Sequence, residues 1–556
     1  MWSFHQYRQI EKEVQHDWQK KRLPHQRDIE EFNLCNSEES NIRLGLQQTQ
    51  SPNSYASPGG RPSSAQHLSA KEDHILVETA SDNDPFDPRN WSLLSRAKNV
   101  AIISLLIFVQ AWAGASDSQT NSPASKFYHV SQVAENLATA MYLFGIGSGC
   151  LFVGPLSESI GRNPTYLIST FCYLFFVLGS ALSESFASHI GCRYFIGVSS
   201  SATLGINGAS VKDMFRPVKR AFVFPVIAWA NVVPPVLAPI VSGWVASRID
   251  IDFRWTEWIT LIISGFVFVI AFLFLPETYV PILLDWKAKH LCRITGSEAY
   301  VSAHAKNASF TARMKQTLPL SLTFLFTEPV IMVLGSFLVL LYILLFSFLS
   351  GFDYIFKRTY ALSYLQSGGC FAGIAIGATA FTLFAPILYT WARRHAEHIS
   401  GAHITPEFRL WPALVTAPLL PISLFWLGWT NYPSISIYSG LGACFCFGIV
   451  LAAMYVSAYE YIIDSYGEHA AIALASITMV RYLIAGGMVL VARPMYERIG
   501  VHWAMTLLGC VATILTPGPW LLFKWGRRLR ERSPYAKVYG KGEGQKNANG
   551  EVWLQG

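Results

Sequence analysis

Charged side chains inside long apolar stretches are the residues of this sequence best placed to do chemistry. Two arginines, Arg193 and Arg481, lie within such stretches, and two carboxylates, Asp117 and Glu460, lie near the ends of others. A charge near the centre of a bilayer costs at least about 2.5–3.5 kcal/mol, so it is rarely kept without a role. Because desolvation favours the neutral form of a carboxyl group, Asp117 and Glu460 are candidates for binding a proton.

Each of these residues also has a structural explanation. Arg193 lies about one turn from the end of its stretch, where an arginine can extend its guanidinium to the lipid headgroups. Arg481 lies midway along its stretch, where an ion pair or backbone carbonyls would satisfy it equally well. Asp117 is explained as a solvated residue at the outer surface, and Asp464, one turn after Glu460, as a solvated charge at a helix end. The sequence leaves both kinds of explanation open.

The elements that carry these residues are about twelve apolar stretches, each near the roughly 20 residues that a helix needs to cross a ~30 Å hydrocarbon core. The first six cover residues 97–119, 135–156, 164–184, 190–211, 221–247 and 256–275. The other six cover residues 328–350, 361–390, 411–430, 435–461, 470–493 and 502–525. In lipid each helix satisfies its own backbone hydrogen bonds. The sequence therefore predicts an all-α membrane protein with about twelve transmembrane helices.

Polar segments divide the chain into five parts. Residues 1–96 are rich in Gln, Ser, Asp and Glu and predict a disordered tail, because they cannot bury enough apolar surface to fold. The apolar halves, 97–275 and 328–525, are separated by a polar loop at 276–327, and a basic tail follows at 526–556.

The loops that join the stretches carry unequal positive charge. With a cytosolic N-terminus, the outside loops hold about half as many Lys and Arg residues as the inside loops. The positive-inside rule then places both termini and the loop 276–327 in the cytosol. The sequon at Asn307 is therefore expected to carry no glycan. We expect a multi-pass protein of the plasma membrane, with a vacuolar or vesicle membrane as the alternative.

The composition excludes several classes of protein. Hydrophobic residues make up 51% of the 556 residues, and charged residues make up 14% with a net charge of +7. The basic residues lie in loops and tails, which does not indicate nucleic-acid binding. His395, Glu397, His398 and His403 lack the spacing of a metal site, and the sequence has no ATP-binding signature or nucleophile elbow. We therefore expect no metal, no cofactor and no enzyme activity, and any transport would draw on an ion gradient.

A short motif between the second and third stretches carries further chemistry. The segment Gly154–Arg162 reads GPLSESIGR. Gly154 and Gly161 permit a tight turn, and Glu158 and Arg162 can pair with each other or cap neighbouring helix ends. The segment resembles the loop signature G-x-L-x-D/E-R-x-G-R of the major facilitator superfamily, in its fungal form GPLSExxGR.

Two further motifs resemble the same superfamily. In the stretch 190–211, Arg193 and Gly197 match the motif R-x-x-x-G, and the segment Gly208–Asp213 (GASVKD) resembles the G-x-x-x-D that follows it. A second segment resembles the antiporter motif G-P-x-x-G-G, and its residues are Pro235, Ala238, Pro239, Ser242 and Gly243. Two glycines of that motif are replaced by alanine and serine, which are small, so close helix packing is expected to survive.

Together with the segments Asp87–Trp91, Leu275–Tyr279 and Pro406–Leu410, these motifs cover most of the apolar region. The chain therefore resembles the fungal twelve-span drug:proton antiporter branch of the superfamily. The resemblance implies two six-helix bundles that rock around a central cavity. It also implies that Arg193 faces this cavity and influences proton release from a nearby carboxylate. A conformational latch between the halves is implied for Gly154, Glu158, Gly161, Arg162 and Asp213.

The implied activity is secondary active transport, with export of a small lipophilic or amphipathic drug, toxin or secondary metabolite by proton antiport. The candidates for proton coupling are Arg193, Glu460, Asp117 and Arg481. Aromatic residues make up 14% of the chain, and an aromatic cavity suits a lipophilic ligand. The candidates for lining it are Phe108, Trp112, Tyr142, Trp229, Tyr455 and Tyr459.

The expected partners are the small molecule, protons and the lipid bilayer, and the protein is expected to act as a monomer. A proton-coupled importer or a polyamine carrier of the same fold stays open as an alternative. A membrane-embedded enzyme is a more distant one.

Overall fold

The computed structural model describes residues 2–16, 18–19, 75–77, 84–248, 250–297, 299–302, 310–398 and 405–536. The chain divides into two compact units. The larger unit holds residues 1–2, 87–279 and 308–556, and the smaller unit holds residues 3–86 and 280–307.

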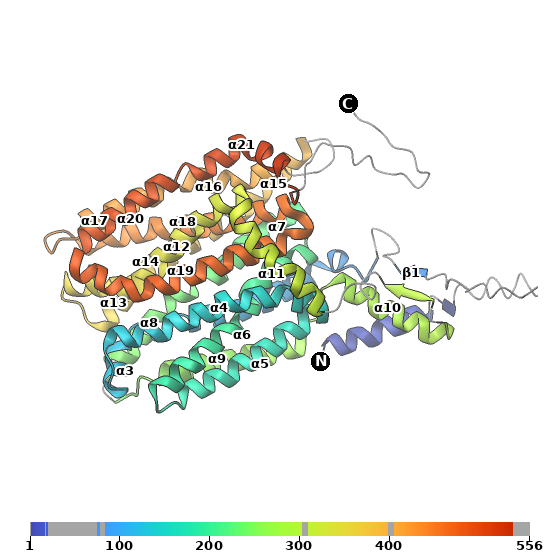
Figure 1. The fold of residues 1–556 in the computed structure, drawn as a ribbon, viewed down its shortest axis with the longest axis horizontal. Helices are drawn as coiled ribbons and strands as arrows, with labels where there is room; N and C mark the ends of the chain where they lie inside the picture. Colours follow the sequence, from blue (N-terminus) through green and yellow to red (C-terminus); the bar gives the residue numbers. More distant parts are fainter. Residues whose placement is uncertain are drawn as a thin grey trace, which may run out of the picture. The chain divides into compact units, whose positions relative to one another are not determined.

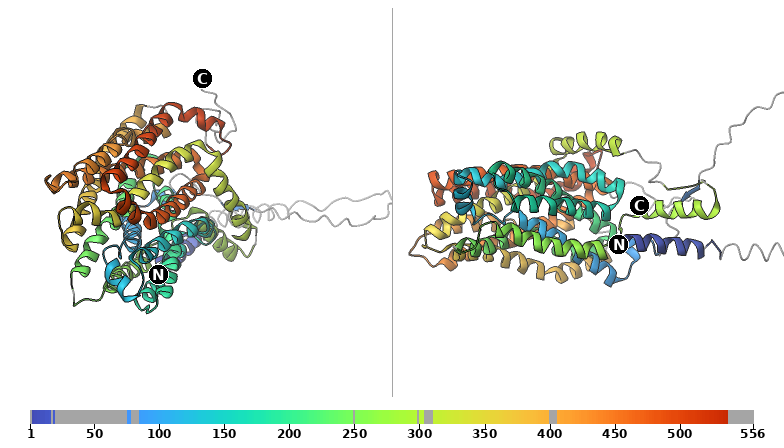
Figure 2. Two further views of the ribbon diagram at one scale, coloured as in Figure 1. Left: turned by 60° about the vertical axis from the view of Figure 1, so that its left-hand side comes forward. Right: turned by 90° about the horizontal axis from the view of Figure 1, so that it is seen from below.

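The larger unit is a bundle of long helices that lie side by side in the views of Figures 1 and 2. Its N-terminal half contains η1 (Pro88–Asn90), α2 (Leu93–Ala113), α3 (Asn121–Phe127), α4 (Gln132–Ile160), α5 (Arg162–Ala181), α6 (Phe186–Met214), α7 (Pro217–Val232), α8 (Pro234–Ser247) and α9 (Trp255–Phe274). Its C-terminal half begins with α11 (Phe310–Thr327), α12 (Pro329–Phe352), η2 (Asp353–Arg358), α13 (Tyr364–Cys370), α14 (Ala372–Leu383) and α15 (Ala385–His398). It continues with η3 (Pro406–Leu410), α16 (Trp411–Thr416), α17 (Leu419–Trp429), α18 (Ile437–Tyr466), η4 (Gly467–His469), α19 (Ala470–Ile499), α20 (Val501–Leu515) and α21 (Gly518–Arg532).

Eleven helical segments in the described part of the chain are long and apolar enough to cross a membrane. The helix α6 is as long as α4, with 29 residues, but five serines and three charged residues make it less apolar. With α6 included, the bundle agrees with the all-α membrane protein of about twelve helices that the sequence predicts. Large apolar side chains such as Phe171, Phe175 and Phe266 are exposed on its surface, as expected for helices that face lipid.

Prolines divide some of the predicted stretches into two helices. The helix α7 ends at Val232 and α8 begins at Pro234, because proline lacks the N–H group that the preceding turn needs. In the same way, α20 ends at Leu515 shortly before Pro517, and α21 begins at Gly518.

Two segments that the composition predicted to lack regular structure contain some. In the smaller unit, residues 3–16 are helical, and β1 (Ile75–Val77) pairs in parallel with β2 (Tyr300–Ser302). The predicted loop 276–327 contains α10 (Val280–Thr295) as well as α11. Within the smaller unit, Leu283 of α10 packs with Ile10 and Val14, so short amphipathic helices bury apolar surface that the overall composition does not reveal. Asn307 lies outside the described residues.

The two halves of the bundle meet along two sides. The helix α4 packs against α19, while α7 and α8 pack against α13, α14, α15 and α18. We refer to the end that carries the α4–α5 turn at Gly161 as the motif end. The α6–α7 and α18–α19 junctions lie at this same end, because successive helices alternate in direction.

Small residues allow close helix contact inside each half. A Cβ added to Gly145 of α4 would meet the backbone of Tyr194 in α6, and a Cβ added to Gly377 of α14 would meet the backbone of Phe445 in α18. These backbone contacts hold α4 against α6 and α14 against α18. The same kind of glycine contact therefore occurs in both halves.

Candidate functional site

A buried ion cluster surrounds Arg193, whose side chain is almost fully enclosed, since the residue is 1% exposed. Its guanidinium pairs with the carboxylate of Asp117 and lies 2.6 Å from a carboxylate oxygen of Glu257. It also donates a hydrogen bond of 2.8 Å to the carbonyl oxygen of Ala113. Asp117 follows α2, Arg193 belongs to α6 and Glu257 begins α9, so three separate segments of the N-terminal half meet here.

Hydroxyl groups and a histidine complete the ion cluster. The Ser180 hydroxyl lies 3.0 Å from both Glu257 Oε1 and His189 Nδ1. The Thr256 hydroxyl donates to Asp117 at 3.1 Å, and His189 Nε2 lies 4.0 Å from the same carboxylate. With His189 neutral, two carboxylates face one guanidinium, so binding a single proton would neutralise the cluster.

The structure brings Arg193 and Asp117 together. The resemblance implied that Arg193 faces a central cavity, but here the side chain is enclosed within the N-terminal half. The helices α2, α5, α6 and α9 pack on one another around the ion cluster. Sequence reasoning missed Glu257, which reads as a charge at a helix start, and His189, which reads as a lone histidine. The usable signal was spacing, because residues four apart, such as His189 and Arg193, share one face of a helix.

Asp117, His189 and Glu257 also lie close enough to hold a metal ion, since one ligand atom of each lies within 4.8 Å of the others. Arg193 already supplies a positive charge to both carboxylates. A divalent cation in the same space would be repelled by the guanidinium. The arrangement therefore suits a proton better than a metal ion.

A second buried arginine, Arg481, lies near the middle of α19 among four tyrosine rings, which we refer to as the tyrosine cage. Its Cζ atom is 4.1 Å from the ring centre of Tyr342 and 5.1 Å from that of Tyr482. The ring centres of Tyr455 and Tyr459 are 5.7 Å and 5.9 Å away. Nη2 donates to the Tyr459 hydroxyl at 3.3 Å, whereas Nε and Nη1 have no hydrogen-bond partner among the described residues.

The tyrosine rings offset part of the cost of burying this cation. A desolvated cation–π contact contributes about 2 kcal/mol, against at least ~2.5–3.5 kcal/mol for a charge at the centre of a bilayer. Within the described part of the chain, no carboxylate lies within ion-pairing distance of Arg481. Arg193, the other arginine buried this completely, pairs with two. The tyrosine cage therefore encloses one positive charge that has no counter-ion among the described residues.

The charges of the predicted latch join elements within one half. Arg162 pairs with Asp213 at 3.1 Å and donates to the Ser157 hydroxyl at 2.5 Å, and all three residues belong to the N-terminal half. Glu158 has no ion pair or hydrogen bond within the described ranges. In this structure the segment thus fastens α5 to the ends of α4 and α6, which differs from the expected bridge between the halves.

Glu277, to which sequence reasoning gave no role, caps the start of α5. Its carboxylate accepts the backbone N–H groups of Arg162 at 3.0 Å and Asn163 at 3.1 Å, and those of its two following residues at 2.8 Å. Burial raises the pKa of Glu277, and these N–H groups oppose that shift. Gly161 has a φ of +103°, and a Cβ there would lie 3.0 Å from the carboxyl carbon of Glu277, so the position requires glycine.

Other charges join the halves at the motif end. Arg220 of α7 lies 2.5 Å from Asp464 of α18, and Arg409 donates to the carbonyl oxygen of Pro217 at 2.7 Å. Arg409 also pairs with Asp464 and with Glu460, each at 2.9 Å. Asp464 is only 7% exposed, so the expectation of a solvated charge was wrong. Glu460, a candidate for proton coupling, is connected to these bridging charges through its pair with Arg409.

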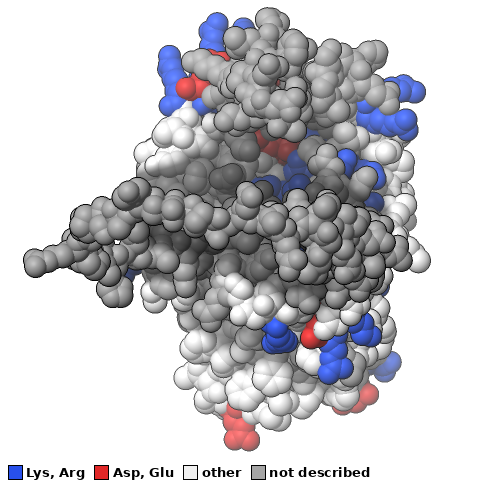
Figure 3. Space-filling view, turned by 90° about the vertical axis from the view of Figure 1, so that its right-hand side faces the viewer, with Lys and Arg blue, Asp and Glu red and all other residues white. Residues whose placement is uncertain are grey.

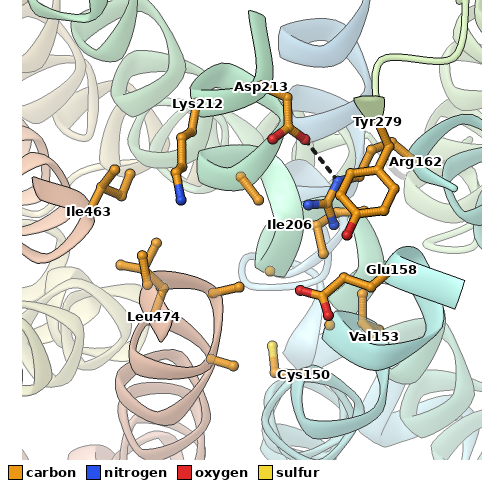
Figure 4. A pocket seen from close by; sticks show the side chains of 16 residues that line it. Cys150, Val153, Glu158, Arg162, Ile206, Lys212, Asp213, Tyr279, Ile463 and Leu474 are labelled. Carbon is orange, nitrogen blue, oxygen red and sulfur yellow. Dashed lines mark hydrogen bonds and ion pairs between the residues drawn. The ribbon is translucent and has the colours of Figure 1, made fainter. Parts of the chain in front are cut away.

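A pocket of about 300 Å³ lies between the halves near the motif end (Figure 4). Its polar lining consists of Glu158, Arg162, Lys212, Asp213 and Tyr279. Burial raises the pKa of Tyr279 to about 12, so its hydroxyl stays protonated at physiological pH. The apolar lining includes Cys150, Ile463, Leu474 and Ala475, so the pocket combines residues of both halves.

The antiporter-like segment lies on α8, where the halves touch. It contains Pro235, Ala238, Pro239, Ser242 and Gly243. A Cβ on Gly243 would lie 2.8 Å from the carbonyl oxygen of Tyr364, and one on Gly368 would lie 2.6 Å from that of Pro239. The backbones of α8 and α13 therefore approach each other closely, in line with the packing expected from small residues.

The six candidate cavity residues fall into separate groups. Tyr455 and Tyr459 belong to the tyrosine cage, and Tyr142 is buried on α4. Phe108 and Trp229 stack with ring centres 5.9 Å apart and line an apolar pocket of about 930 Å³ formed by residues of α2, α7 and α15. Trp112 stacks on Phe108 at 6.3 Å.

Comparisons with known proteins agree with this architecture. Residues 100–490 match the Major Facilitator Superfamily. The chain is 38% identical over 463 residues to the MFS-type transporter kojT of Aspergillus flavus, which covers 83% of this chain and 82% of the relative. It is 30% identical over 470 residues to the citrinin biosynthesis cluster MFS transporter mrr1 of Monascus ruber, covering 84% and 93%.

Solved structures share the fold at low sequence identity. The human organic anion transporter MFSD10 superposes with a TM-score of 0.52 and 16% identity, covering 77% of this chain and 100% of that one. The xylose transporter XylE from E. coli superposes with a TM-score of 0.52 and 15% identity, covering 77% and 99%. The helical bundle, the sequence match and these relatives lead to one conclusion. The chain belongs to the major facilitator superfamily and is a multi-pass membrane transporter, not an enzyme.

Proposed function

We propose that this transporter exports a small lipophilic or amphipathic compound, such as a secondary metabolite, toxin or drug, in exchange for protons. The ion cluster around Arg193 carries the proposal. Two buried carboxylates share one guanidinium there, and one additional proton would neutralise them. A buried group of this kind binds or releases a proton when its neighbours move.

Proton binding would be coupled to transport through the helices that carry the ion cluster. Arg193 lies on α6, whose other end carries Asp213 and Lys212 beside the pocket at the motif end. Protonation of Asp117 or Glu257 weakens its attraction to Arg193, which frees α6 and α9 to shift. A ligand or proton that favours one conformation by 1.4 kcal/mol changes its population about tenfold.

The bridging charges at the motif end would form the gate in place of the predicted latch. Arg220 and Asp464 must separate before the halves part at this end. Lys212, which donates to the Gly467 carbonyl oxygen at 2.6 Å, spans the same gap. These contacts hold the motif end closed and would break in the conformation that admits substrate from that side.

Two observations support the kind of substrate. Two relatives are named for a citrinin biosynthesis cluster, which favours a secondary metabolite. The apolar pocket beside Phe108 and Trp229 suits a lipophilic molecule. A polyamine is disfavoured, because the unpaired charge of Arg481 would repel a cation.

We propose the plasma membrane as the site of action, with both termini in the cytosol and a monomer as the working form. Exposed basic residues near the motif end support this orientation, and they include Arg216, Lys219, Arg393, Arg394, Arg527 and Arg528. Lys and Arg side chains are more frequent than Asp and Glu on the face shown in Figure 3.

The test compares cells that lack the transporter with cells that overproduce it, across a panel of toxins and metabolites. The proposal predicts that overproduction lowers the intracellular amount of at least one compound and that a protonophore abolishes the difference. Equal accumulation of every compound in both strains would contradict export. Export that persists with the protonophore would contradict proton coupling.

A further inference from the structure

Among the described residues, Arg481 has no carboxylate partner, whereas five other buried arginines of the bundle have one. Arg96, which is also buried, donates to the carbonyl oxygen of Arg89 instead. Those that contact a carboxylate are Arg162, Arg193, Arg220, Arg409 and Arg530. Arg481 is fully buried, and the contacts of its guanidinium within the described residues include four tyrosine rings and one tyrosine hydroxyl. An anionic ligand gains the most binding free energy beside a buried cation that has no counter-ion.

Hydrogen-bond donors in the tyrosine cage are also left without acceptors. Within the described part of the chain, Arg481 Nε and Nη1 are buried and have no partner, and the same holds for the hydroxyl of Tyr455. Buried polar groups are normally paired. The unpaired N–H groups of the guanidinium and the unpaired hydroxyl can each donate a hydrogen bond to an oxygen anion.

The tyrosine rings give the cage flat apolar faces. Tyr455 and Tyr459 stack with ring centres 4.2 Å apart, and Tyr342 and Tyr482 meet edge to face at 5.3 Å. The faces of such rings suit stacking by a planar conjugated molecule. The cage thus combines recognition of a negative charge with recognition of a flat ring system.

The position of Arg481 selects a translocated ligand over a lipid headgroup. It is the twelfth residue of α19, about 17 Å from the start of that helix and therefore near mid-membrane depth. The pocket at the motif end reaches Ala475, six residues or about 9 Å earlier on the same helix. The cage therefore lies beyond the inner limit of a pocket that both halves form.

We propose that the tyrosine cage binds the anionic group of a planar organic ligand, a carboxylate, enolate or phenolate, with Arg481 as its counter-ion. One of the rings moves aside to admit the ligand. That the ligand is the exported compound rests on the function proposed above, whereas the binding itself does not.

The test measures equilibrium binding to the purified full-length protein in lipid nanodiscs at pH 7, without any pH gradient. The probes are 2-naphthoate, which is ionised, and 2-naphthamide, which has nearly the same shape but no charge. Wild-type protein is expected to bind 2-naphthoate at least tenfold more tightly than 2-naphthamide. In Arg481→Gln this preference is expected to vanish, while binding of 2-naphthamide stays within about threefold of wild type.

Three further variants separate the possible causes. Arg498→Gln removes an exposed arginine from the same helix and is expected to keep the preference. Arg481→Lys keeps the charge but loses the N–H groups of the planar guanidinium, so part of the preference for 2-naphthoate should remain. Tyr455→Phe removes one hydroxyl donor and should weaken 2-naphthoate binding severalfold, which provides a readout should Arg481→Gln fail to fold.

A wild-type protein that does not distinguish the two probes would overturn the proposal. So would an Arg481→Gln protein that retains the preference, or, where that variant does not fold, a Tyr455→Phe protein that binds 2-naphthoate like wild type. Because no gradient is present, each of these results is independent of whether the protein exports by proton exchange.

Discussion

Arg193 and Asp117, which lie 76 residues apart in the sequence, form an ion pair inside the N-terminal half, and Glu257 lies 2.6 Å from the same guanidinium. The arginine is thus shared by two acids from different segments of the chain. Any movement of α6 relative to α9 changes how well each acid is compensated. This relationship makes the ion cluster sensitive to both conformation and proton concentration.

Removing the shared cation should change the pH dependence of transport. Without the guanidinium of Arg193, the two carboxylates repel each other and retain a proton up to higher pH. In Arg193→Ala, we expect the midpoint of the pH–rate profile of substrate exchange to move to higher pH, with lower maximal flux. Exchange rates measured across pH 5 to 9 in proteoliposomes test this, and an unshifted midpoint would count against a titrating role for the cluster.

The gate at the motif end should open more often when Arg220 is neutralised. Arg220→Gln removes the pair with Asp464, while Arg409 still compensates that carboxylate. We expect the pocket residue Cys150 to react severalfold faster with a maleimide, measured by mass spectrometry of its peptide. Arg527→Gln, which removes an exposed pair with Glu531, is the matched control and should leave the rate unchanged. Equal rates in all three proteins would show that Arg220 does not hold the halves together.

Gly161→Ala should destabilise the protein more than Gly500→Ala. Both glycines have positive φ, +103° and +79°, so alanine is strained at either position by about 1–3 kcal/mol. Only at Gly161 would the added Cβ also displace the carboxylate of Glu277, since Gly500 has open space around it. Thermal unfolding of the purified proteins should show the larger decrease in apparent midpoint temperature for Gly161→Ala. Equal losses would mean that the cap on α5 contributes little.

Epitope tags test the proposed orientation. Tags placed at Met1 and Gly556 should bind antibody only after the cell is permeabilised. The sequon at Asn307 should carry no glycan, so glycosidase treatment should not change the protein's mobility. Labelling of either tag on intact cells would reverse the assignment of the motif end to the cytosol.

The sequence predicted the helices far better than the partners of their charges. Runs of about 20 apolar residues predict transmembrane helices. The resemblance to the superfamily followed from short motifs at the ends of these helices. Arg193 and Asp117 were recognised because charge in an apolar stretch is rare. Glu257 was missed and Asp464 was misjudged, because a position near a helix end predicts solvent exposure unless a neighbouring helix covers the residue. The sequence does not show which helices are neighbours.

The same limit applies to Arg162 and Arg481. The motif that contains Arg162 indicated a charged turn but not that Asp213 of its own half, instead of the other half, would pair with it. For Arg481, the sequence left an ion pair and capture of backbone carbonyls open. The tyrosine cage takes its rings from α18 and α19, which follow one another in the chain, and from α12, which is distant in the sequence. The four rings meet only in the folded bundle.

The most direct test of proton-coupled export uses vesicles with an imposed pH gradient and a transported compound found in the cell panel. Flux should rise with the gradient in wild-type protein and in Glu460→Gln, collapse when a protonophore is added, and lose its dependence on the gradient in Asp117→Asn. Wild-type flux that ignores both the gradient and the protonophore would contradict proton exchange and indicate facilitated diffusion.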